Sequence, residues 1–355
     1  MSQETRIHLA PAHPYMGWVS MNRYWQALVK ESSGDHDVAS LVSGGPVEAG
    51  AKSRWQGLWT RRVVYPWIVR SQVRSGVLHV LDHSFADLLA HVRPSVRTVV
   101  TVHDLIPLTD PADLTAAQYA RFRKTVACLT RADCIVCVSD YTKSEVQRLL
   151  QVPDEKLHVL PNGSSALPPQ DLVMKERMTK LPTYIFSVGG TRPRKNLRLL
   201  PPLMKHLAEM GYRATLVRAG GKLEAELARE IRLHANLHEL GPVNDGELAA
   251  CYAGAGLTLI PSTQEGFGMP VLEAMNAGCP VVYSLATSLP EVAGDAGLGF
   301  DPRDTLQAAH QCYRIFTDTD LRSQLIELGH RRAGKFSWKA HWLGLRRLYG
   351  ELLSS

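Results

Sequence analysis

Residues 260–295 read IPSTQEGFGMPVLEAMNAGCPVVYSLATSLPEVAGD. The apolar run that leads into this stretch predicts a buried strand, and the glycines of residues 266–268 predict a loop that lets backbone approach a ligand. Residues 269–276 have the composition of a helix, which Gly278 ends. Amide hydrogens and the helix dipole at such a helix entrance favour an anion. The stretch therefore predicts a phosphate-binding strand, loop and helix of an α/β fold.

Two carboxylates flank this predicted anion site. Glu265 lies in the loop, and Glu273 lies about one turn inside the helix, where its side chain tilts back toward the helix entrance. Carboxylates repel phosphate but accept hydrogen bonds from hydroxyl groups. A phosphate group flanked by hydroxyl groups describes a sugar nucleotide, so the pattern predicts that class of ligand.

The spacing of the two glutamates also carries a family resemblance. Glu265, seven intervening residues and Glu273, within EGFGMPVLEAM and followed by G-x-PVV, resemble the signature of the retaining family-4 glycosyltransferases of GT-B fold. The resemblance implies two Rossmann-like α/β domains whose parallel sheets face an interdomain cleft. The alternative is an ordinary strand, loop and helix in which the glutamates are solvated, but the Gly-Phe-Gly-Met-Pro context favours the family.

A cationic turn, GGTRPRKN at residues 189–196, follows a second predicted strand. Arg192, Arg194 and Lys195 crowd the entrance of the next predicted helix, where positive charge opposes the helix dipole. A bound anion would neutralise this excess of positive charge. The alternative is a solvated basic turn. The resemblance implies that this turn binds a diphosphate, although Gly190 stands where many relatives have an arginine.

Further site residues are implied by the resemblance. His103 ends an apolar strand at residues 98–102, where open α/β sheets place ligands, and its family counterpart approaches the transferred sugar. The alternative is a histidine whose hydrogen bonds are satisfied at a strand end. The predicted catalytic residues are His103, Glu265 and Lys195, and the predicted donor-binding residues are Gly17, Arg192, Arg194, Lys195, Val243, Gly266, Phe267, Gly268, Met269 and Glu273.

Length and alternation of elements predict the domain organisation. A chain of 355 residues exceeds what one hydrophobic core usually serves, and strand–helix alternation starts twice. We expect a first domain at residues 1–165, a Pro-bearing linker at 166–183 and a nucleotide-sugar domain at 184–335. The resemblance implies that a helix at 336–355 returns to the first domain.

Charge distribution suggests a further partner. The net charge is +6, and residues 51–75 contain six cations, no acidic residue, and Trp55, Trp59, Tyr65 and Trp67. This composition suits an anionic membrane surface, while the alternative is a basic helix whose tryptophans pack inward. Nucleic acid is not expected as a partner. With no apolar run of about 18 residues and no secretory signal, we expect a cytoplasmic protein, free or peripheral on the inner face of the membrane.

The sequence indicates no metal site and no cofactor. The pairs Asp35/Asp37 and Asp318/Asp320 have a spacing that binds divalent cations elsewhere, but their turn and helix-start positions suit structural roles. The expected activity is retaining, metal-independent transfer of a hexose from a nucleotide sugar to a polysaccharide, oligosaccharide or lipid-linked acceptor. The chain has a PRKN turn and a strand ending in HDL, and its resemblance to relatives with these two motifs favours GDP-mannose as the donor. The alternatives are an inert nucleotide-sugar-binding scaffold and a sugar-nucleotide 2-epimerase.

Overall fold

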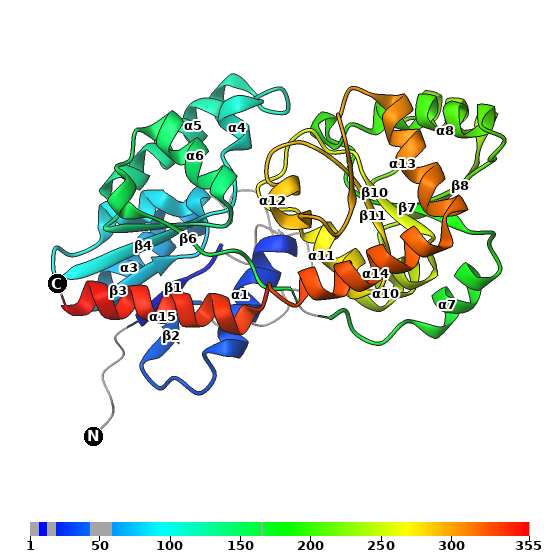
Figure 1. Ribbon diagram of the computed structural model, residues 1–355. Helices are drawn as coiled ribbons and strands as arrows, with labels where there is room; N and C mark the ends of the chain where they lie inside the picture. The colour runs from blue at the N-terminus through cyan, green and yellow to red at the C-terminus, as the bar shows by residue number, and fades with distance from the viewer. Residues whose placement is uncertain (1–6, 13–18, 43–58, 165, 355) are drawn as a thin grey trace. The chain divides into compact units, whose positions relative to one another are not determined.

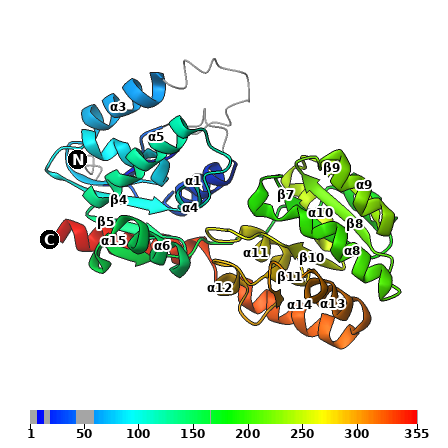
Figure 2. The same ribbon diagram turned by 90° about the horizontal axis from the view of Figure 1, so that it is seen from above.

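The computed structural model describes residues 7–12, 19–42, 59–164 and 166–354. The chain divides into two compact units, one formed by Met1–Gly163 with Trp338–Ser355 and the other by Ser164–Ser337. The predicted border stood at residue 165, and the predicted returning helix began at residue 336. Each unit is a layered α/β structure (Figures 1 and 2).

The first unit contains a parallel six-stranded sheet in the order β2-β1-β3-β4-β5-β6. Its strands are β1 (Ile7–Ala10), β2 (Val38–Ser40), β3 (Gly76–Val80), β4 (Val96–Val102), β5 (Cys134–Cys137) and β6 (Leu157–Val159). Its α-helices are α1 (Val19–Glu31), α3 (Tyr65–Gln72), α4 (Ile106–Thr109), α5 (Ala116–Val126), α6 (Asp140–Leu150) and α15 (Trp338–Ser354). Shorter helical turns are η2 (Thr60–Val64), η3 (His83–His91), η4 (Ala127–Arg131) and η5 (Asp154–Lys156).

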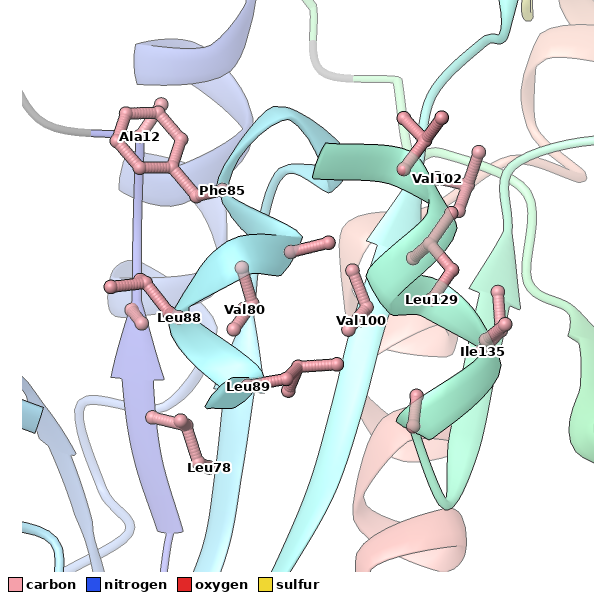
Figure 3. Close-up of a cluster of buried hydrophobic side chains, with 14 of the residues drawn as sticks. Ala12, Leu78, Val80, Phe85, Leu88, Leu89, Val100, Val102, Leu129 and Ile135 are labelled. Carbon is pink, nitrogen blue, oxygen red and sulfur yellow. The ribbon is translucent and has the colours of Figure 1, made fainter. Parts of the chain in front are cut away.

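The core of the first unit lies on both faces of this sheet. Strands β3, β4 and β5 are buried along almost their whole length, which is why their sequences are apolar and β-branched rather than alternating. One face packs against η3, where Phe85, Leu88 and Leu89 meet side chains of β3 and β4 (Figure 3). The opposite face packs against α1 and α15.

The second unit repeats the plan with a parallel sheet in the order β12-β11-β10-β7-β8-β9. Its strands are β7 (Tyr184–Gly189), β8 (Thr215–Gly220), β9 (Asn236–Gly241), β10 (Leu257–Ile260), β11 (Val281–Ser284) and β12 (Leu298–Phe300). Its α-helices are α7 (Leu172–Thr179), α8 (Leu200–Glu209), α9 (Ala225–His234), α10 (Asp245–Gly254), α11 (Met269–Asn276), α12 (Leu289–Ala293), α13 (Thr305–Thr317) and α14 (Thr319–Ala333), with short turns η6 (Pro193–Lys195) and η7 (Leu197–Leu199).

This strand order decides which loops meet in the second unit. Strand β7 pairs with β10 on one side and with β8 on the other, and all three run parallel. Their carboxyl ends therefore share one edge of the sheet, where parallel α/β sheets bind ligands. The loop after β10 and the cationic turn after β7 become neighbours although about 70 residues separate them, as the contact between Lys195 and Glu265 shows.

The predicted linker at residues 166–183 contains helix α7. The Asp171 side chain accepts a hydrogen bond from the Met174 amide and caps this helix. Met174 and Met178 are buried, and α7 packs against α10. The segment is thus part of the second unit, and its prolines only precede the helix.

Helix α15 belongs to the first unit and is held there by polar contacts as well as apolar ones. Trp342 donates a hydrogen bond of 2.9 Å to Asp35, and Arg346 lies 2.9 Å from Asp37. These two aspartates therefore have the structural role that the sequence predicted for them. The Asp318 side chain accepts from the Leu321 amide at the start of α14, which confirms its predicted capping role.

Only residues 59–75 of the basic aromatic stretch 51–75 are described, and they form η2 and α3. The inward-packing alternative is wrong for Trp59 and Trp67, which are 62% and 66% exposed, while Tyr65 is buried and donates to the Pro11 carbonyl. Arg61 turns inward, where it donates to the Ser84 carbonyl and stacks on an aromatic ring. The described part of the stretch thus exposes two of its aromatic residues and buries part of its charge.

Candidate active site

The loop between β10 and α11 forms as the sequence predicts, and α11 has the predicted bounds, Met269–Asn276. Gly268 precedes the helix with a φ of +109°, a conformation that disfavours side chains. A Cβ there would also lie 2.8 Å from Leu289 of α12. Gly266 and Phe267 are buried beside it, so the loop is closely packed against the unit that carries it.

Glu265 meets the cationic turn directly. Lys195 Nζ lies 2.5 Å from Glu265 Oε1, and Arg194 Nη1 lies 3.3 Å from Glu265 Oε2. The Glu265 side chain is only 12% exposed. The sequence predicted separate contacts of these residues with sugar and diphosphate, and the structure brings all three into one cluster at the carboxyl ends of β7 and β10.

The electrostatics of the cluster favour an ionised carboxylate. Burial alone would raise the pKa of Glu265, but the neighbouring charges of Lys195 and Arg194 and the hydrogen bond from Lys195 hold this pKa below its ordinary value. Glu265 is therefore a carboxylate at neutral pH. Two cations face one anion, so the cluster has positive charge left for a further anionic group.

Thr287 and Ser288 hold the Glu265 loop in place, and sequence reasoning missed both. The Glu265 amide donates 2.9 Å to Thr287 Oγ1, and Ser288 Oγ lies 2.9 Å from the carbonyl oxygens of Glu265 and Phe267. Both residues follow β11, the neighbour of β10, so their position after an adjacent strand was the available signal. The loop shape is thus fixed by side chains about 22 residues downstream.

Glu273 lies inside the second unit with 7% exposure. Its Oε2 accepts a hydrogen bond of 3.0 Å from Tyr252 OH, and Tyr252 packs edge-on against Phe186 of β7. Glu273 also lines a cavity of about 330 Å³ together with Asn276 and the segment before α7. Its carboxylate is therefore held by a hydrogen bond within the unit and also borders a cavity.

The remaining predicted residues have different positions. Arg192 is exposed at the start of the cationic turn, and Val243 is half-buried in the loop between β9 and α10. Met269 begins α11, while Gly17 lies outside the described residues. Their predicted contacts with a donor stay predictions.

His103 lies in the first unit, directly after β4, whereas the Glu265 cluster lies in the second unit. It is 7% exposed, its Nε2 lies 2.9 Å from the Leu81 carbonyl, and its ring meets Tyr24 edge-on at 4.8 Å. Burial lowers the pKa of His103. The ring is thus neutral at pH 7, donating from Nε2 and leaving the Nδ1 lone pair as an acceptor.

A chain of buried hydrogen bonds lies behind His103. Tyr349 OH lies 2.6 Å from His79 Nδ1, and His79 Nε2 lies 2.8 Å from Thr101 Oγ1. Thr101 lies 3.1 Å from Tyr24 OH, which lies 2.9 Å from His341 Nε2. His341 Nδ1 in turn lies 2.9 Å from the Pro161 carbonyl. The chain ties α1, β3, β4 and α15 together.

The direction of this chain follows from its ends. A carbonyl only accepts, so His341 Nδ1 carries a proton, and Nε2 of a neutral His341 must accept from Tyr24. Because the Tyr24 proton is used in this bond, Tyr24 accepts a hydrogen bond from Thr101. Thr101 in turn accepts a hydrogen bond from the protonated Nε2 of His79. Burial lowers the pKa of His79 to about 3 and that of His341 to about 4. Both histidines are therefore neutral, and one arrangement of protons satisfies every group.

Other features of the described residues bear on the site. No helix there is both long and apolar enough to cross a bilayer. No group of three or more His, Cys, Asp or Glu side chains in those ranges lies close enough together to hold a metal ion.

Comparison with known proteins agrees with this architecture. Residues 21–165 match the family described as Glycosyltransferase Family 4, and residues 173–332 match Glycosyl transferases group 1. O-antigen chain mannosyltransferase B of Escherichia coli is 32% identical over 68% of this chain and 67% of its own length. The serotype-specific mannosyltransferase WbdA of Escherichia coli is 30% identical over 68% of this chain, which spans only 32% of WbdA.

Comparison with solved structures identifies the fold of the chain. Sucrose-phosphate synthase from Thermosynechococcus elongatus superposes with a TM-score of 0.74 and 20% identity over 98% of this chain and 99% of its own. Two parallel six-stranded sheets with flanking helices are the GT-B arrangement that the sequence predicted, so the fold is confirmed. Together with the identity to mannosyltransferase B, these matches show that the chain belongs to the family-4 glycosyltransferases.

Proposed function

We propose that this glycosyltransferase moves mannose from GDP-mannose to a glycan or lipid-linked acceptor with retention of configuration and without a metal ion. The names of its mannosyltransferase relatives support the sugar. The observation that carries the proposal is the cluster of Lys195, Arg194 and Glu265, because it gathers two cations and a hydroxyl acceptor at one sheet edge.

The cluster suits departure of a nucleoside diphosphate. As the bond between sugar and phosphate breaks, negative charge grows on the phosphate, and Lys195 and Arg194 stabilise that charge. The amides of residues 266–268 lie at the entrance of α11, where a helix dipole adds to the same effect. These groups stabilise the negative charge of the leaving diphosphate, as a divalent cation does in other enzymes.

Retention is proposed to occur by attack on the face that the diphosphate leaves. Each Glu265 oxygen lies near a cation, at 2.5 and 3.3 Å, which lowers the nucleophilicity of the carboxylate. Glu265 is better suited to accept hydrogen bonds from the sugar than to form a covalent intermediate. In this mechanism the leaving phosphate oxygen takes the proton of the acceptor hydroxyl.

Glu273 is proposed to bind the ribose of the donor. Its carboxylate accepts a hydrogen bond from Tyr252 and borders the cavity beside α11. Ribose hydroxyls donate to carboxylates, and hydrogen bonds to a charged acceptor contribute about 1.5–3 kcal/mol. The two glutamates would then bind different parts of one ligand.

The decisive experiment incubates the protein with isotopically labelled GDP-mannose, a glycan acceptor and excess EDTA. A transferase yields GDP and an α-linked product with the anomeric configuration of the donor, which NMR detects. Glu265→Gln should reduce turnover but leave GDP affinity nearly intact, whereas the exposed Glu209→Gln is the matched control and should change neither. An epimerised nucleotide sugar, binding without reaction, or activity that requires added magnesium would each reject the proposal.

The proposed function includes binding to an anionic membrane surface through η2 and α3. Trp59, Val63 and Trp67 are spaced four residues apart, so they share one helix face, and they are 62%, 50% and 66% exposed. Arg62 and Arg70 are exposed on the same short segment. Interfacial tryptophans beside arginines are typical of helices that lie on anionic lipid.

Vesicle sedimentation tests this surface. The wild type should sediment with phosphatidylglycerol vesicles more than with phosphatidylcholine vesicles, and added salt should weaken the binding. Trp67→Ser should weaken it, while Leu233→Ser, a matched exposed apolar residue on α9, should not. Equal sedimentation of Trp67→Ser and wild type would show that this helix face does not bind lipid.

A further inference from the structure

Arg218, on strand β8, is a buried cation in the second unit. It is 2% exposed, and no carboxylate among the described residues forms an ion pair with it. Its neighbour Glu239 on β9 instead accepts from the Leu223 amide and lies 3.6 Å from Arg232. Burying a charge without an ionic partner costs desolvation free energy. The hydrogen bonds that Arg218 makes must therefore offset this cost.

The contacts of Arg218 lead to the cationic turn. Its Nη2 donates to the carbonyl oxygens of Gly189 and Gly190, both at 2.9 Å, while its Nε has no hydrogen-bond partner within the described residues. Gly189 has a φ of +130°, and a Cβ on Gly220 would lie 2.3 Å from the Gly189 carbonyl. The guanidinium thus holds the first two peptide groups of the turn, those that begin at Gly189 and Gly190, through their carbonyl oxygens.

Fixing these carbonyls also orients the amides. In a trans peptide the N–H points opposite to the C=O, and the described chain has no cis peptide bond. The Gly190 and Thr191 amides therefore point away from Arg218. A Cβ on Gly189 would lie 3.7 Å from Lys195 Cε, so the Lys195 side chain lies over the same glycine.

We infer that Arg218 is a positioning residue for the diphosphate of the donor. It holds the Gly189–Gly190 backbone so that two amides and the Lys195 side chain face one anionic group, and its own buried charge adds positive potential beneath them. The inference rests on the proposed function, because the anion is the diphosphate of the nucleotide sugar. Arg218 acts through the turn and does not itself touch the ligand.

Calorimetric titration with GDP tests this inference, with Arg218→Met as the main variant. Loss of the two carbonyl contacts should raise the dissociation constant for GDP about tenfold or more. Arg332→Met is the matched control, because Arg332 also donates to two backbone carbonyls of this unit, those of Glu291 and Val292. Arg332→Met should lower the melting temperature but leave GDP affinity within about twofold.

Two further variants separate positioning from folding. Arg218→Lys keeps the charge and a donor, so it should recover part of the affinity that Arg218→Met loses. Arg218→Gln keeps a donor without the charge, so it should bind more weakly than Arg218→Lys, and it serves where Arg218→Met does not fold. If Arg218→Met, or Arg218→Gln in its place, binds GDP as tightly as the wild type, the positioning role is refuted.

The same titration separates this inference from the proposed function. If the wild type binds neither GDP nor UDP, the proposed function fails and the role of Arg218 fails with it. If the wild type binds GDP and the Arg218 variants bind equally well, only the positioning role fails. Equal weakening by Arg218→Met and Arg332→Met would also overturn it, because the effect would then follow stability alone.

Discussion

Lowering the pH from 7 to 5 should weaken the first unit through two buried histidines, His79 and His341. Burial lowers their pKa values in the folded chain to about 3 and about 4, from an ordinary value of 6.5. The unfolded chain therefore binds protons at a higher pH than the folded chain does. The stabilisation is complete above pH 6.5 and is lost as the pH falls from 6.5 toward the folded values.

The magnitude follows from these pKa values. Below pH 6.5 each histidine costs about 1.4 kcal/mol of unfolding free energy per pH unit. Between pH 7 and 5 the pair should therefore cost roughly 3–4 kcal/mol, a large share of the stability of an ordinary domain. A protonated His341 would also have no lone pair to accept from Tyr24, so the chain of hydrogen bonds would break at that point.

Urea unfolding at several pH values between 7 and 5, with hydrogen exchange of the α15 amides as the local probe, measures this loss. His341→Gln should lower the slope of unfolding free energy against pH by about 1.4 kcal/mol per pH unit. His310→Gln, an exposed histidine in the second unit, is the control and should leave the slope of the α15 signal unchanged. A His341→Gln slope equal to that of the wild type would refute the assignment of acid sensitivity to this chain.

Three further predictions concern the second unit. Lys195→Ala should cost roughly 2–4 kcal/mol of transition-state stabilisation in kcat/KM, and a smaller loss would mean that Lys195 does not face the leaving group. Glu273→Gln should weaken both GDP and GDP-mannose by calorimetry, by roughly 1.5–3 kcal/mol if the bond is lost, and unchanged GDP affinity would contradict the ribose contact. Gly220→Ala should destabilise the protein by at least about 1 kcal/mol in urea, because its Cβ would meet the Gly189 carbonyl at 2.3 Å; an unchanged midpoint would contradict that clash.

Local signals in the sequence were sufficient to predict the helix and the strands that carry the site. The bounds of α11 follow from Gly268 before it and Gly278 after it, which have φ values of +109° and +70°. The buried parallel strands follow from continuous apolar runs. Segment 166–183 shows the limit of composition. Its prolines at 168 and 169 predict a loop, whereas Asp171 caps helix α7.

Contacts over long sequence separation could not be predicted in this way. The approach of Lys195 to Glu265 depends on the pairing of β7 with β10, and strand order is a property of the whole sheet. Arg218 looked like an ordinary strand residue in TLVRAG, although a cation within an apolar run was the signal for a special partner. The roles of His103, Gly17 and Val243 toward a donor stay predictions.

The discontinuous first unit has a consequence for synthesis of the protein. Its sheet is complete by Val159, but α15, which covers one face of that sheet, is made only after the whole second unit. The second unit is continuous from Ser164 to Ser337, so it has all of its residues before α15 exists. On the ribosome, therefore, the first unit is begun before the second and completed after it, and its exposed apolar face is a natural substrate for chaperones until α15 is made.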